Sequence, residues 1–413
     1  MTSSHAPDLT ALADAVLAAT TDLKQALAEP DTPESTIESR SDAFSTATTA
    51  LNTALNGPAS KLYDIAMSQF DLLALDFFLD YRIVEHLSLD AGVALADIAE
   101  KIGVDENRTG RLLRHLATHG LLREHVGVFY LTPDSVVLKD PMANATLSMI
   151  TDDMTRPSAF STAAIRKNPH SAKVEHAPWA EAWGAPQYEW YKSQPAEREE
   201  RFALTQEGMT TMYKPNTLVL DWAKNKLTAP SGVILDIGGG NGHISIGLSK
   251  HLPSYSFEVQ DNSPKMFEAS AAANADLPHI TFRQHDYFNP QPAHEKPVLA
   301  IILRHVLHTW NDEKAAKILQ ALVPTMQAHP QARILVNDTV MVEPGAVHPL
   351  RERKQRYFDM VMMVVANARQ RTESEWRQLV HGVKGLVVEE VLVGGGGPVG
   401  VVVVRYEGEA KGA

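Results

Sequence analysis

One stretch of the sequence contains four glycines at the point where an expected strand ends and an expected helix begins. Residues 233–237 form a short strand-like run in which Asp236 is the one polar side chain. The glycines that follow are Gly238, Gly239, Gly240 and Gly242. They permit a tight turn in which the backbone approaches a ligand closely. From His243 to Pro253 the apolar spacing becomes helical, and free N–H groups at a helix start bind electronegative groups. The stretch therefore predicts a nucleotide-type site.

The spacing of these glycines excludes two common nucleotide motifs. A dinucleotide fingerprint needs Gly-x-Gly-x-x-Gly or Ala, and its third position falls on His243. A phosphate loop needs Gly-Lys-Ser or Gly-Lys-Thr, which does not follow these glycines. The remaining pattern is Asp-x-Gly-x-Gly-x-Gly, beginning at Asp236. The alternative is a glycine-rich hairpin without a ligand, but the flanking strand and helix favour a ligand.

Two later carboxylates stand where a nucleoside would need them. Residues 256–260 alternate like a strand that Asp261 ends, and a carboxylate there is placed to accept from both ribose hydroxyls. A third strand, 280–284, precedes Asp286 and Tyr287. We expect Asp286 to accept from an adenine amino group while the aromatic neighbour covers the ring. The alternative for Asp286 is a turn residue.

A second polar stretch follows the fourth expected strand, residues 298–303. It brings Arg304, His305 and His308 to the carboxyl edge of the sheet, where open α/β sheets bind ligands. Asp338 stands near the end of the next strand. Without its neighbours, His308 would be a histidine satisfied inside a strand–helix junction. His305 and His308 lack an evident third ligand, so we expect no metal and a packed or solvated His305.

Together these motifs resemble the plant and fungal small-molecule O-methyltransferases, which are class I enzymes dependent on S-adenosylmethionine (SAM). The glycine turn resembles their first motif, which holds the amino-acid end of SAM. Residues 303–312 resemble their signature Leu-x-x-x-Leu/Cys-His-Asp-Trp/Tyr-x-Asp, in which the histidine is the general base. The resemblance implies that His308 is the base and that Arg304 contacts the cofactor region. Thr309 departs from the usual Asp.

The resemblance also implies roles for residues around the base. Asp338 falls where the family has an acid that orients the histidine, and Gln370 stands where a second orienting Glu is expected. Met209 and Met363 correspond to methionines that line the acceptor pocket. Residues 60–145, which read as a winged helix, correspond to the family's dimerisation domain.

The neutral amide of Gln370 leaves a second function open. Some fungal biosynthetic proteins of this fold keep SAM bound without transferring its methyl group and act as pericyclases or dehydratases. The sulfonium then serves as a fixed positive charge. The hydrogen-bond donors to the substrate would be Arg304, His308, Asn337 and Gln370. A SAM-sensing regulator that uses the winged helix is disfavoured by the acidity of that segment.

Methyl transfer to a hydroxyl sets an energetic requirement that these residues fit. A phenol titrates near pKa 10 and a histidine near 6.5, so full proton transfer is uphill by roughly 5 kcal/mol. A sulfonium at about 4 Å favours the phenolate by up to about 4 kcal/mol. Asp338 would hold the imidazole tautomer and stabilise its charged form. The prediction is metal-independent methylation of a small aromatic or polyketide substrate.

The elements that position these residues follow from the pattern. Strands and helices alternate from residue 230, which predicts a doubly wound parallel sheet of the Rossmann-like kind, with a helix over 312–327 capped by Asn311. Residues 387–393 and 399–405 form a hairpin, so the last strand is expected to be antiparallel, as in methyltransferases. Arg333 to Val340 is expected to be one strand.

Four parts are expected: an N-terminal helical arm (1–58), a winged-helix-like dimerisation domain (59–150), a helical connector (151–228) and the SAM-binding catalytic domain (229–413). In the arm, one helix runs from Leu9 to Leu27 and another begins near Asp42, with a polar loop between them. The connector contains an aromatic cluster, which forms a core, lines a flat substrate, or both.

Composition limits the partners. Across the winged-helix segment acidic residues outnumber basic ones, which argues against DNA binding by Arg108, Arg111 and Arg114. We expect these arginines to be solvated or salt-bridged and the segment to mediate a homodimer. A net charge of −12 over 413 residues disfavours nucleic-acid and membrane-surface partners. With no cysteine and no secretory signal pattern, a cytoplasmic protein is expected.

Overall fold

The computed structural model describes residues 8–212, 217–394 and 399–408. The chain divides into two compact units, Met1–Asp140 with His348–Leu350, and Pro141–Val347 with Arg351–Ala413. The helices that follow Asp140 therefore belong to the same unit as the large sheet. The finer four-part division stays a prediction.

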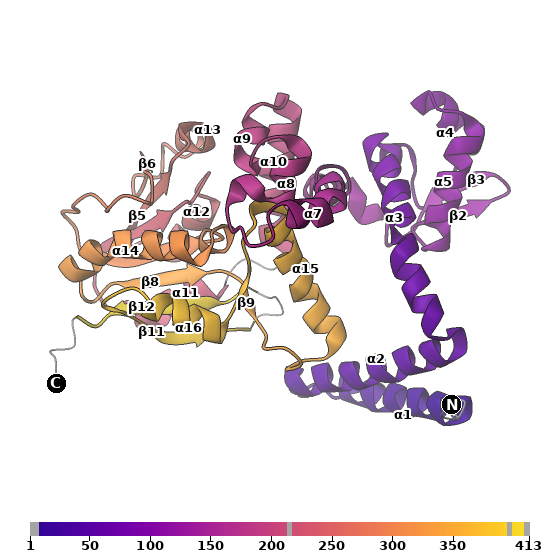
Figure 1. Ribbon diagram of the computed structural model, residues 1–413, viewed down its shortest axis with the longest axis horizontal. Coiled ribbons are helices and arrows are strands. Elements are labelled where there is room, and N and C mark those ends of the chain that lie inside the picture. Colours follow the sequence, from indigo (N-terminus) through magenta and orange to yellow (C-terminus); the bar gives the residue numbers. More distant parts are fainter. Residues whose placement is uncertain (1–7, 213–216, 395–398, 409–413) are drawn as a thin grey trace. The chain divides into compact units, whose positions relative to one another are not determined.

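The first unit begins with two helices that lie side by side, α1 (Leu9–Ala28) and α2 (Glu34–Asn56) (Figure 1). The expectation of a polar loop up to Asp42 is wrong, since α2 begins at Glu34. The residues of α2 are intermediate or exposed, and none is buried. An exposed helix needs no strong apolar stripe, so a polar composition is compatible with a helix here. The prediction was wrong because it took this polar composition as the sign of a loop.

The rest of the first unit is a winged-helix arrangement, as predicted. Its elements are α3 (Pro58–Asp80), η1 (Ile83–His86), β1 (Val93–Ala94), α4 (Leu95–Ile102), α5 (Glu106–Thr118), β2 (Leu122–His125), β3 (Val128–Leu131) and η2 (Val136–Lys139). The strands form a small antiparallel sheet in the order β1-β3-β2. Ile98, Leu113 and Phe129 are fully buried. Arg114 donates to the Glu124 carboxylate through Nε and Nη2 at 2.7–3.1 Å, so this arginine is salt-bridged.

The second unit opens with helices. They are α6 (Pro141–Ser148), η3 (Met149–Asp153), α7 (Thr155–Lys167), η4 (Val174–His176), α8 (Pro178–Trp183), α9 (Gln187–Lys192), α10 (Ala196–Met212) and α11 (Thr217–Lys226). Trp179, Trp190 and Tyr191 are buried against one another. The Tyr191 hydroxyl donates to the buried carboxylate of Asp153 at 2.8 Å. These three aromatic residues therefore form a core.

A seven-stranded sheet follows, in the order β11-β12-β8-β7-β4-β5-β6. Its strands are β4 (Gly232–Ile237), β5 (Tyr255–Asp261), β6 (Ile280–Gln284), β7 (Val298–Arg304), β8 (Arg333–Asn337), β11 (Leu386–Leu392) and β12 (Val401–Tyr406). Strands β4 to β8 pair in parallel, while β12 runs antiparallel to both of its neighbours. The predicted parallel sheet with an antiparallel last strand is confirmed.

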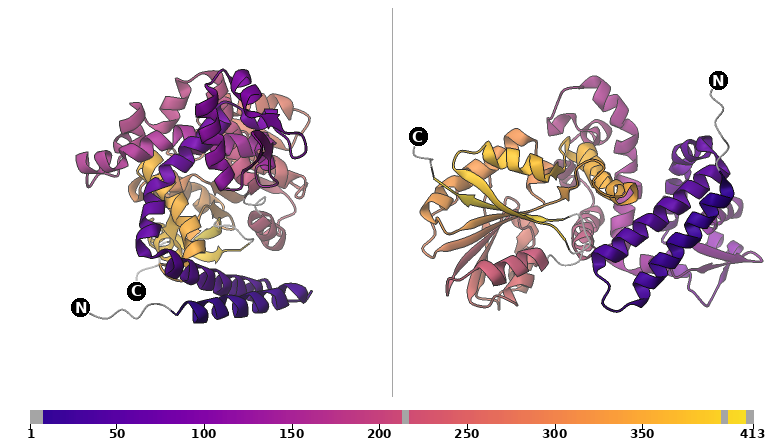
Figure 2. Two further views of the ribbon diagram at one scale, coloured as in Figure 1. Left: turned by 90° about the vertical axis from the view of Figure 1, so that its right-hand side faces the viewer. Right: turned by 90° about the horizontal axis from the view of Figure 1, so that it is seen from below.

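Helices cover both faces of this sheet (Figure 2). They are α11, α12 (His243–Ser249), α13 (Pro264–Ala273), α14 (Asp312–Ala328) and α16 (Glu373–His381). Helix α15 (Pro349–Ala366) packs instead against the aromatic residues of the preceding helices. Successive residues of β4 point to opposite faces. Leu235 packs in the core that contains α14 and α16, and Ile234 packs in the core that contains α11 and α12. Asn311 caps α14 as predicted, accepting from Lys314 N at 2.9 Å.

Strand β8 ends earlier than expected. The prediction of a strand through Val340 is wrong, because the chain leaves the sheet after Asn337. Val340–Met341 (β9) instead pairs in parallel with Arg371–Thr372 (β10). The separate two-stranded sheet brings the segment that carries Gln370 beside the one that carries Asp338.

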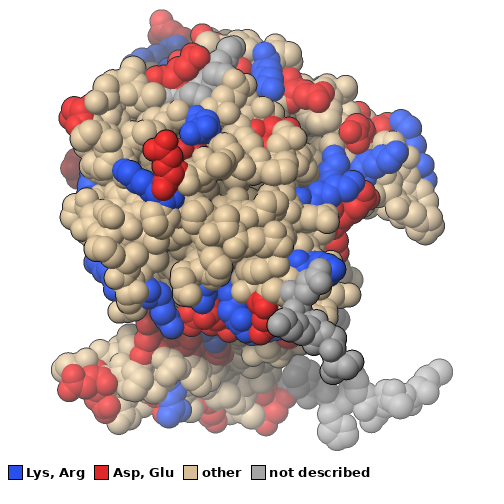
Figure 3. Space-filling view, turned by 90° about the vertical axis from the view of Figure 1, so that its left-hand side faces the viewer, with Lys and Arg blue, Asp and Glu red and all other residues tan. Residues whose placement is uncertain are grey.

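The surface carries charges of both signs. On the face shown in Figure 3, basic and acidic side chains are interspersed rather than gathered by sign. Within residues 8–212, 217–394 and 399–408, no helix is both long and apolar enough to cross a membrane.

Candidate active site

The glycine turn folds back over the carboxylate that begins its motif. Gly238 and Gly240 have positive φ angles of 69° and 55°, which side chains rarely adopt. A Cβ on Gly239 would lie 2.7 Å from the Asp236 carboxyl carbon. Both features explain why glycine occupies these positions. Gly238, Gly239 and Gly240 are each partly exposed.

Asp236 is a residue of this site that the sequence prediction did not include. It is buried at the end of β4, and its Oδ2 accepts from the Ser245 hydroxyl at 2.6 Å. Burial raises the pKa of Asp236 to about 6, while Ser245 and Arg304 oppose the rise. The carboxylate ties the strand, the turn and α12 together. Its place as the first residue of the Asp-x-Gly motif was the available signal.

Asp261 lies directly against the turn. Its Oδ2 accepts from Gly240 N at 3.2 Å, and its Oδ1 accepts from Ser263 N at 2.9 Å. Burial raises the pKa of Asp261, although these backbone donors oppose the rise. The structure therefore brings the predicted glycine turn and the predicted ribose carboxylate together at one edge of the sheet.

Asp286 adopts the turn role that the sequence left open. Its Oδ1 accepts from Phe288 N at 3.0 Å. Tyr287, Phe288 and Trp310 form an aromatic group, in which Trp310 Nε1 donates to the Tyr287 hydroxyl at 3.1 Å. Burial raises the Tyr287 pKa above its usual value. Tyr287 is thus a neutral, fixed ring next to Asp286.

The turn and the histidine loop are in contact. A Cβ on Gly238 would lie 2.8 Å from Val306 Cγ2 and 3.7 Å from the Tyr287 ring. Val306 immediately precedes the short helix η5 (Leu307–Thr309), which contains His308. The cofactor-type turn therefore lies against the segment that positions the proposed base.

His308, Asp338 and Gln370 come together as the resemblance implied. The Nδ1 atom of buried His308 lies 3.0 Å from Asp338 Oδ1 and 3.1 Å from Gln370 Nε2. The His308 backbone N–H also donates to Asp338 Oδ2 at 3.2 Å. Burial raises the pKa of Asp338, but His308, His305 and Arg371 outweigh it and the pKa falls below its usual value. The carboxylate is ionised at neutral pH.

These contacts favour one tautomer of the histidine. A carboxylate only accepts, so the 3.0 Å approach of Asp338 Oδ1 favours the tautomer with the proton on Nδ1 of His308, although among the described residues this oxygen has no aligned hydrogen-bond donor. Nδ1–H cannot also accept from an amide N–H. Among the described residues Gln370 Oε1 is buried without a partner, and turning the amide over points this oxygen at Nδ1–H. The Gln370 oxygen then has a donor, and in this tautomer Nε2 of His308 carries no proton.

His305 is packed on one side, and its side chain stays 31% exposed. Its ring stacks on His308 with centroids 5.0 Å apart, and its Nδ1 lies 3.4 Å from Asp338 Oδ1. Burial lowers the His305 pKa to about 4, so it is neutral. The expectation that the two histidines lack a third ligand is wrong. The ligand atoms of His305, His308 and Asp338 lie within 4.8 Å of one another.

Arg304 lies at the carboxyl end of β7 as predicted. Its Nη1 donates to Asn337 Oδ1 at 2.6 Å, and Asn337 Nδ2 donates to the Gly400 carbonyl at 2.7 Å. Burial lowers the Arg304 pKa, while Asp338 and Asp236 counteract this. The guanidinium is therefore attracted by two carboxylates, Asp236 beside the glycine turn and Asp338 beside His308.

Arg371 is a positioning residue that the sequence reasoning missed. Its buried guanidinium donates to the carbonyls of Leu307 and Trp310 at 3.1 and 2.9 Å. Its Nε and Nη2 also donate to Asp312 Oδ1 at 2.9 and 2.8 Å. These bonds fix both ends of the His308 segment. The signal was its place directly after Gln370, in the stretch already singled out.

The two methionines predicted to line the acceptor pocket differ in what the structure shows. Met363 in α15 is partly buried against the cluster that includes Trp179 and Trp190. Met209 belongs to α10, but its side chain lies outside the described residues. Neither is shown in contact with His308, so their role stays a prediction.

The fold and the site define a class I methyltransferase. The last strand is antiparallel, a glycine turn lies against Asp261, and a His–Asp pair stands at the same edge of the sheet. The O-methyltransferase domain model matches residues 163–385, and the O-methyltransferase dimerisation domain model matches residues 71–139. The chain belongs to the O-methyltransferase family, and its cofactor is SAM.

Individual relatives are of fungal origin. O-methyltransferase sol2 of Alternaria solani is 31% identical over 331 residues, covering 79% of this chain and 75% of sol2. A chlorophenol O-methyltransferase of Trichoderma longibrachiatum is 27% identical, covering 85% and 76%. A solved structure described as a pericyclic reaction enzyme has a TM-score of 0.75 at 20% identity, covering 95% and 100%. This last likeness concerns the fold.

Proposed function

We propose that the protein methylates a phenolic hydroxyl of a small aromatic or polyketide metabolite, with His308 as general base and without a metal. One observation carries the proposal: Nδ1 of His308 lies 3.0 Å from the ionised Asp338. This contact leaves Nε2 of His308 free to accept a proton. The phenolic class is further supported by the relative that is named for chlorophenol.

The residues around the turn fit the cofactor. SAM supplies an electrophilic methyl group on a sulfonium. Gly238, Gly239 and Gly240 form a partly exposed turn without side chains, Asp261 is a carboxylate for hydroxyl groups, and Arg304 is a cation at the same edge. Asp286 keeps one oxygen that its turn does not use. We assign the adenine end to Asp286 and Tyr287.

The chain's own part in the chemistry is to move one proton. Nε2 of His308 accepts the hydroxyl proton as the oxygen becomes nucleophilic. The imidazolium that results is stabilised by Asp338, which stays ionised throughout. Neutral His305, stacked on the other ring, adds no competing positive charge. The proton later leaves to solvent from Nε2.

The acceptor is expected to bind near the aromatic connector. Trp179, Trp190 and Tyr191 are committed to the core, whereas Trp183 is partly buried and Tyr188 is 57% exposed. The rings of Trp183 and Tyr188, together with Met363, would contact a flat apolar substrate. We assign Met209 to the same pocket by its family position.

We also propose that the protein is a homodimer. Helix α3 carries exposed large apolar residues, including Leu62, Ile65 and Leu73, of which Leu62 is 71% exposed. The dimerisation-domain match begins on this helix. An exposed apolar face of this kind is covered by a partner in stable proteins. Analytical ultracentrifugation tests this, and a monomer at every concentration would refute it.

The function is tested with purified protein, SAM and a panel of phenolic aromatic and polyketide compounds. A methylated product and S-adenosylhomocysteine are expected in equal amounts, with no loss of rate after treatment with EDTA. Loss of activity in EDTA that a divalent metal restores would contradict the metal-independent mechanism. Turnover of an amine but no hydroxyl compound would contradict the substrate class.

One observation favours a second candidate, a SAM-bound pericyclase or dehydratase. Gln370 places a neutral amide against His308, so the base has one carboxylate partner instead of two. Arg304, His308 and Gln370 would then act by hydrogen bonds to a substrate carbonyl. Conversion of a substrate with SAM required but no S-adenosylhomocysteine formed would support this candidate over methyl transfer.

A further inference from the structure

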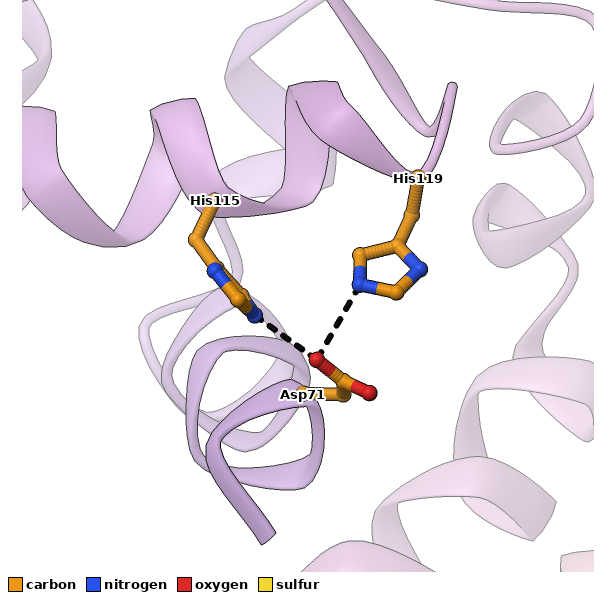
Figure 4. Close-up of side chains that lie close together, drawn as sticks. All are labelled: Asp71, His115 and His119. Carbon is orange, nitrogen blue, oxygen red and sulfur yellow. Dashed lines mark hydrogen bonds and ion pairs between the residues drawn. The ribbon is translucent and has the colours of Figure 1, made fainter. Parts of the chain in front are cut away.

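Three metal-binding side chains converge in the winged-helix unit, which does not contain the proposed base. Asp71 lies in α3, His115 lies in α5, and His119 directly follows the last residue of α5 (Figure 4). The histidines are four residues apart, so one helical turn places both rings on the same side. Their Nε2 atoms lie 2.8 and 3.1 Å from one oxygen, Asp71 Oδ1. Two imidazoles thus point at a single carboxylate.

This donor set is the one that zinc prefers. Zinc binds imidazole nitrogen and carboxylate oxygen in tetrahedral sites, and sites with three protein ligands keep water in the fourth position. The ligand atoms of Asp71, His115 and His119 already lie within 4.8 Å of one another. Bonds of about 2.0–2.2 Å at tetrahedral angles separate ligand atoms by roughly 3.3–3.6 Å. The His–Asp distances of 2.8 and 3.1 Å must therefore open by roughly 0.2–0.8 Å.

The surroundings allow this small movement. The side chains of His115, His119 and Asp71 are 38%, 45% and 41% exposed. They have room to adjust, and water can reach the open coordination position. Asp71 Oδ2 is not used by either histidine. Binding requires each ring to carry its proton on Nδ1 rather than Nε2, an exchange that solvent provides.

We propose that Asp71, His115 and His119 bind one zinc-like divalent cation that joins α3 to α5. Helix α3 also carries the exposed apolar face that we assign to the homodimer. A bound cation would hold this helix in place on the winged-helix core. Among the described residues neither histidine has a carboxylate or carbonyl partner at Nδ1, so we expect micromolar rather than nanomolar affinity.

The test is zinc titration of the full-length protein, without a polyhistidine tag and stripped with a chelator. One zinc per chain is expected by calorimetry, together with a higher melting temperature. His115→Ala and His119→Ala should each weaken zinc binding by at least tenfold. Asp71→Asn separates hydrogen bonding from metal binding. Its amide oxygen still accepts from both histidines, while the negative charge of the metal ligand is lost. This variant should keep the metal-free melting temperature and lose the zinc-induced increase.

Two control variants locate the site. His125→Ala removes an exposed histidine of β2 outside the cluster and should leave zinc binding unchanged. His308→Ala disrupts the other His–Asp group and should also leave the stoichiometry at one. Cobalt in place of zinc should give the intense visible absorption of a four-coordinate site. Absence of binding at millimolar zinc, or binding lost only in His308→Ala, would overturn the proposal.

Discussion

The carboxylate of Asp338 holds His308 at two points: Oδ1 lies 3.0 Å from the ring Nδ1, and Oδ2 accepts from the backbone N–H of the same residue at 3.2 Å. The first contact favours the tautomer with the proton on Nδ1. The second fixes the loop from which the ring projects. One buried side chain thereby controls both the tautomer and the position of the proposed base.

Replacing Asp338 with Asn should separate the effect of its charge from the effect of its size and position. The amide keeps the size of the carboxylate but removes its charge, so we expect kcat to fall by about 10²–10⁴. The SAM dissociation constant should stay within a few-fold. A variant with nearly normal kcat would show that His308 does not need a carboxylate partner.

The same substitution predicts a change in stability with pH. Because folding lowers the pKa of Asp338, the carboxylate contributes stability above its unfolded value of about 3.9. This contribution is lost as the pH falls through the lower folded pKa. Urea unfolding near pH 6 and near pH 3 should therefore show a steeper loss in the wild type than in Asp338→Asn. Equal losses would contradict the assigned direction.

Replacing Gln370 with Glu should restore the second acidic partner that the family pattern contains. A second negative charge near Nδ1 favours imidazolium, so the acidic limb of the pH–kcat/KM profile should move to higher pH. Above that limb the methylation rate should rise. Gln370→Ala is the control for lost packing, and it should lower the rate without moving the limb in this direction. An unchanged profile in Gln370→Glu would show that this position does not act on the base.

Adding one methyl group to the glycine turn should damage cofactor binding. In Gly238→Ala the new Cβ would meet Val306 at 2.8 Å in a positive-φ position. We expect a loss of stability on the order of 1–3 kcal/mol and at least tenfold weaker SAM binding. Calorimetric titration with SAM and urea unfolding check both effects.

Gly247→Ala is the matched control for this change. It lies on α12, five residues after the turn, and its Cβ would meet nothing within 4 Å. An alanine inside a helix should stabilise the protein by roughly 0.5–1 kcal/mol. If both alanines weakened SAM binding equally, close approach at Gly238 would not be the cause.

Local patterns in the sequence predicted much of the catalytic unit. Strand β6 spans residues 280–284 as predicted, and Asn311 caps α14. The order of motifs also placed Asp261 and His308 at one sheet edge, because parallel strands end together there. Each of these features depends on residues close in sequence or on the topology of a known kind of sheet.

Contacts between distant segments were not predictable in this way. Arg371 binds carbonyls more than 60 residues away, at Leu307 and Trp310, and the residue type alone does not reveal the partners. The end of β8 at Asn337 depends on pairing with β12 and on the separate β9–β10 ladder. The start of α2 was missed because exposed polar residues fit a loop and a surface helix equally well.

The most direct test of the mechanism measures S-adenosylhomocysteine against product in single turnovers of the wild type and His308→Ala, both saturated with SAM. Equal amounts of the two products are expected in the wild type. In His308→Ala we expect a rate lower by about 10²–10⁴ and SAM affinity within a few-fold of the wild type. Product without S-adenosylhomocysteine, or an unchanged rate in His308→Ala, would contradict methyl transfer by a histidine base.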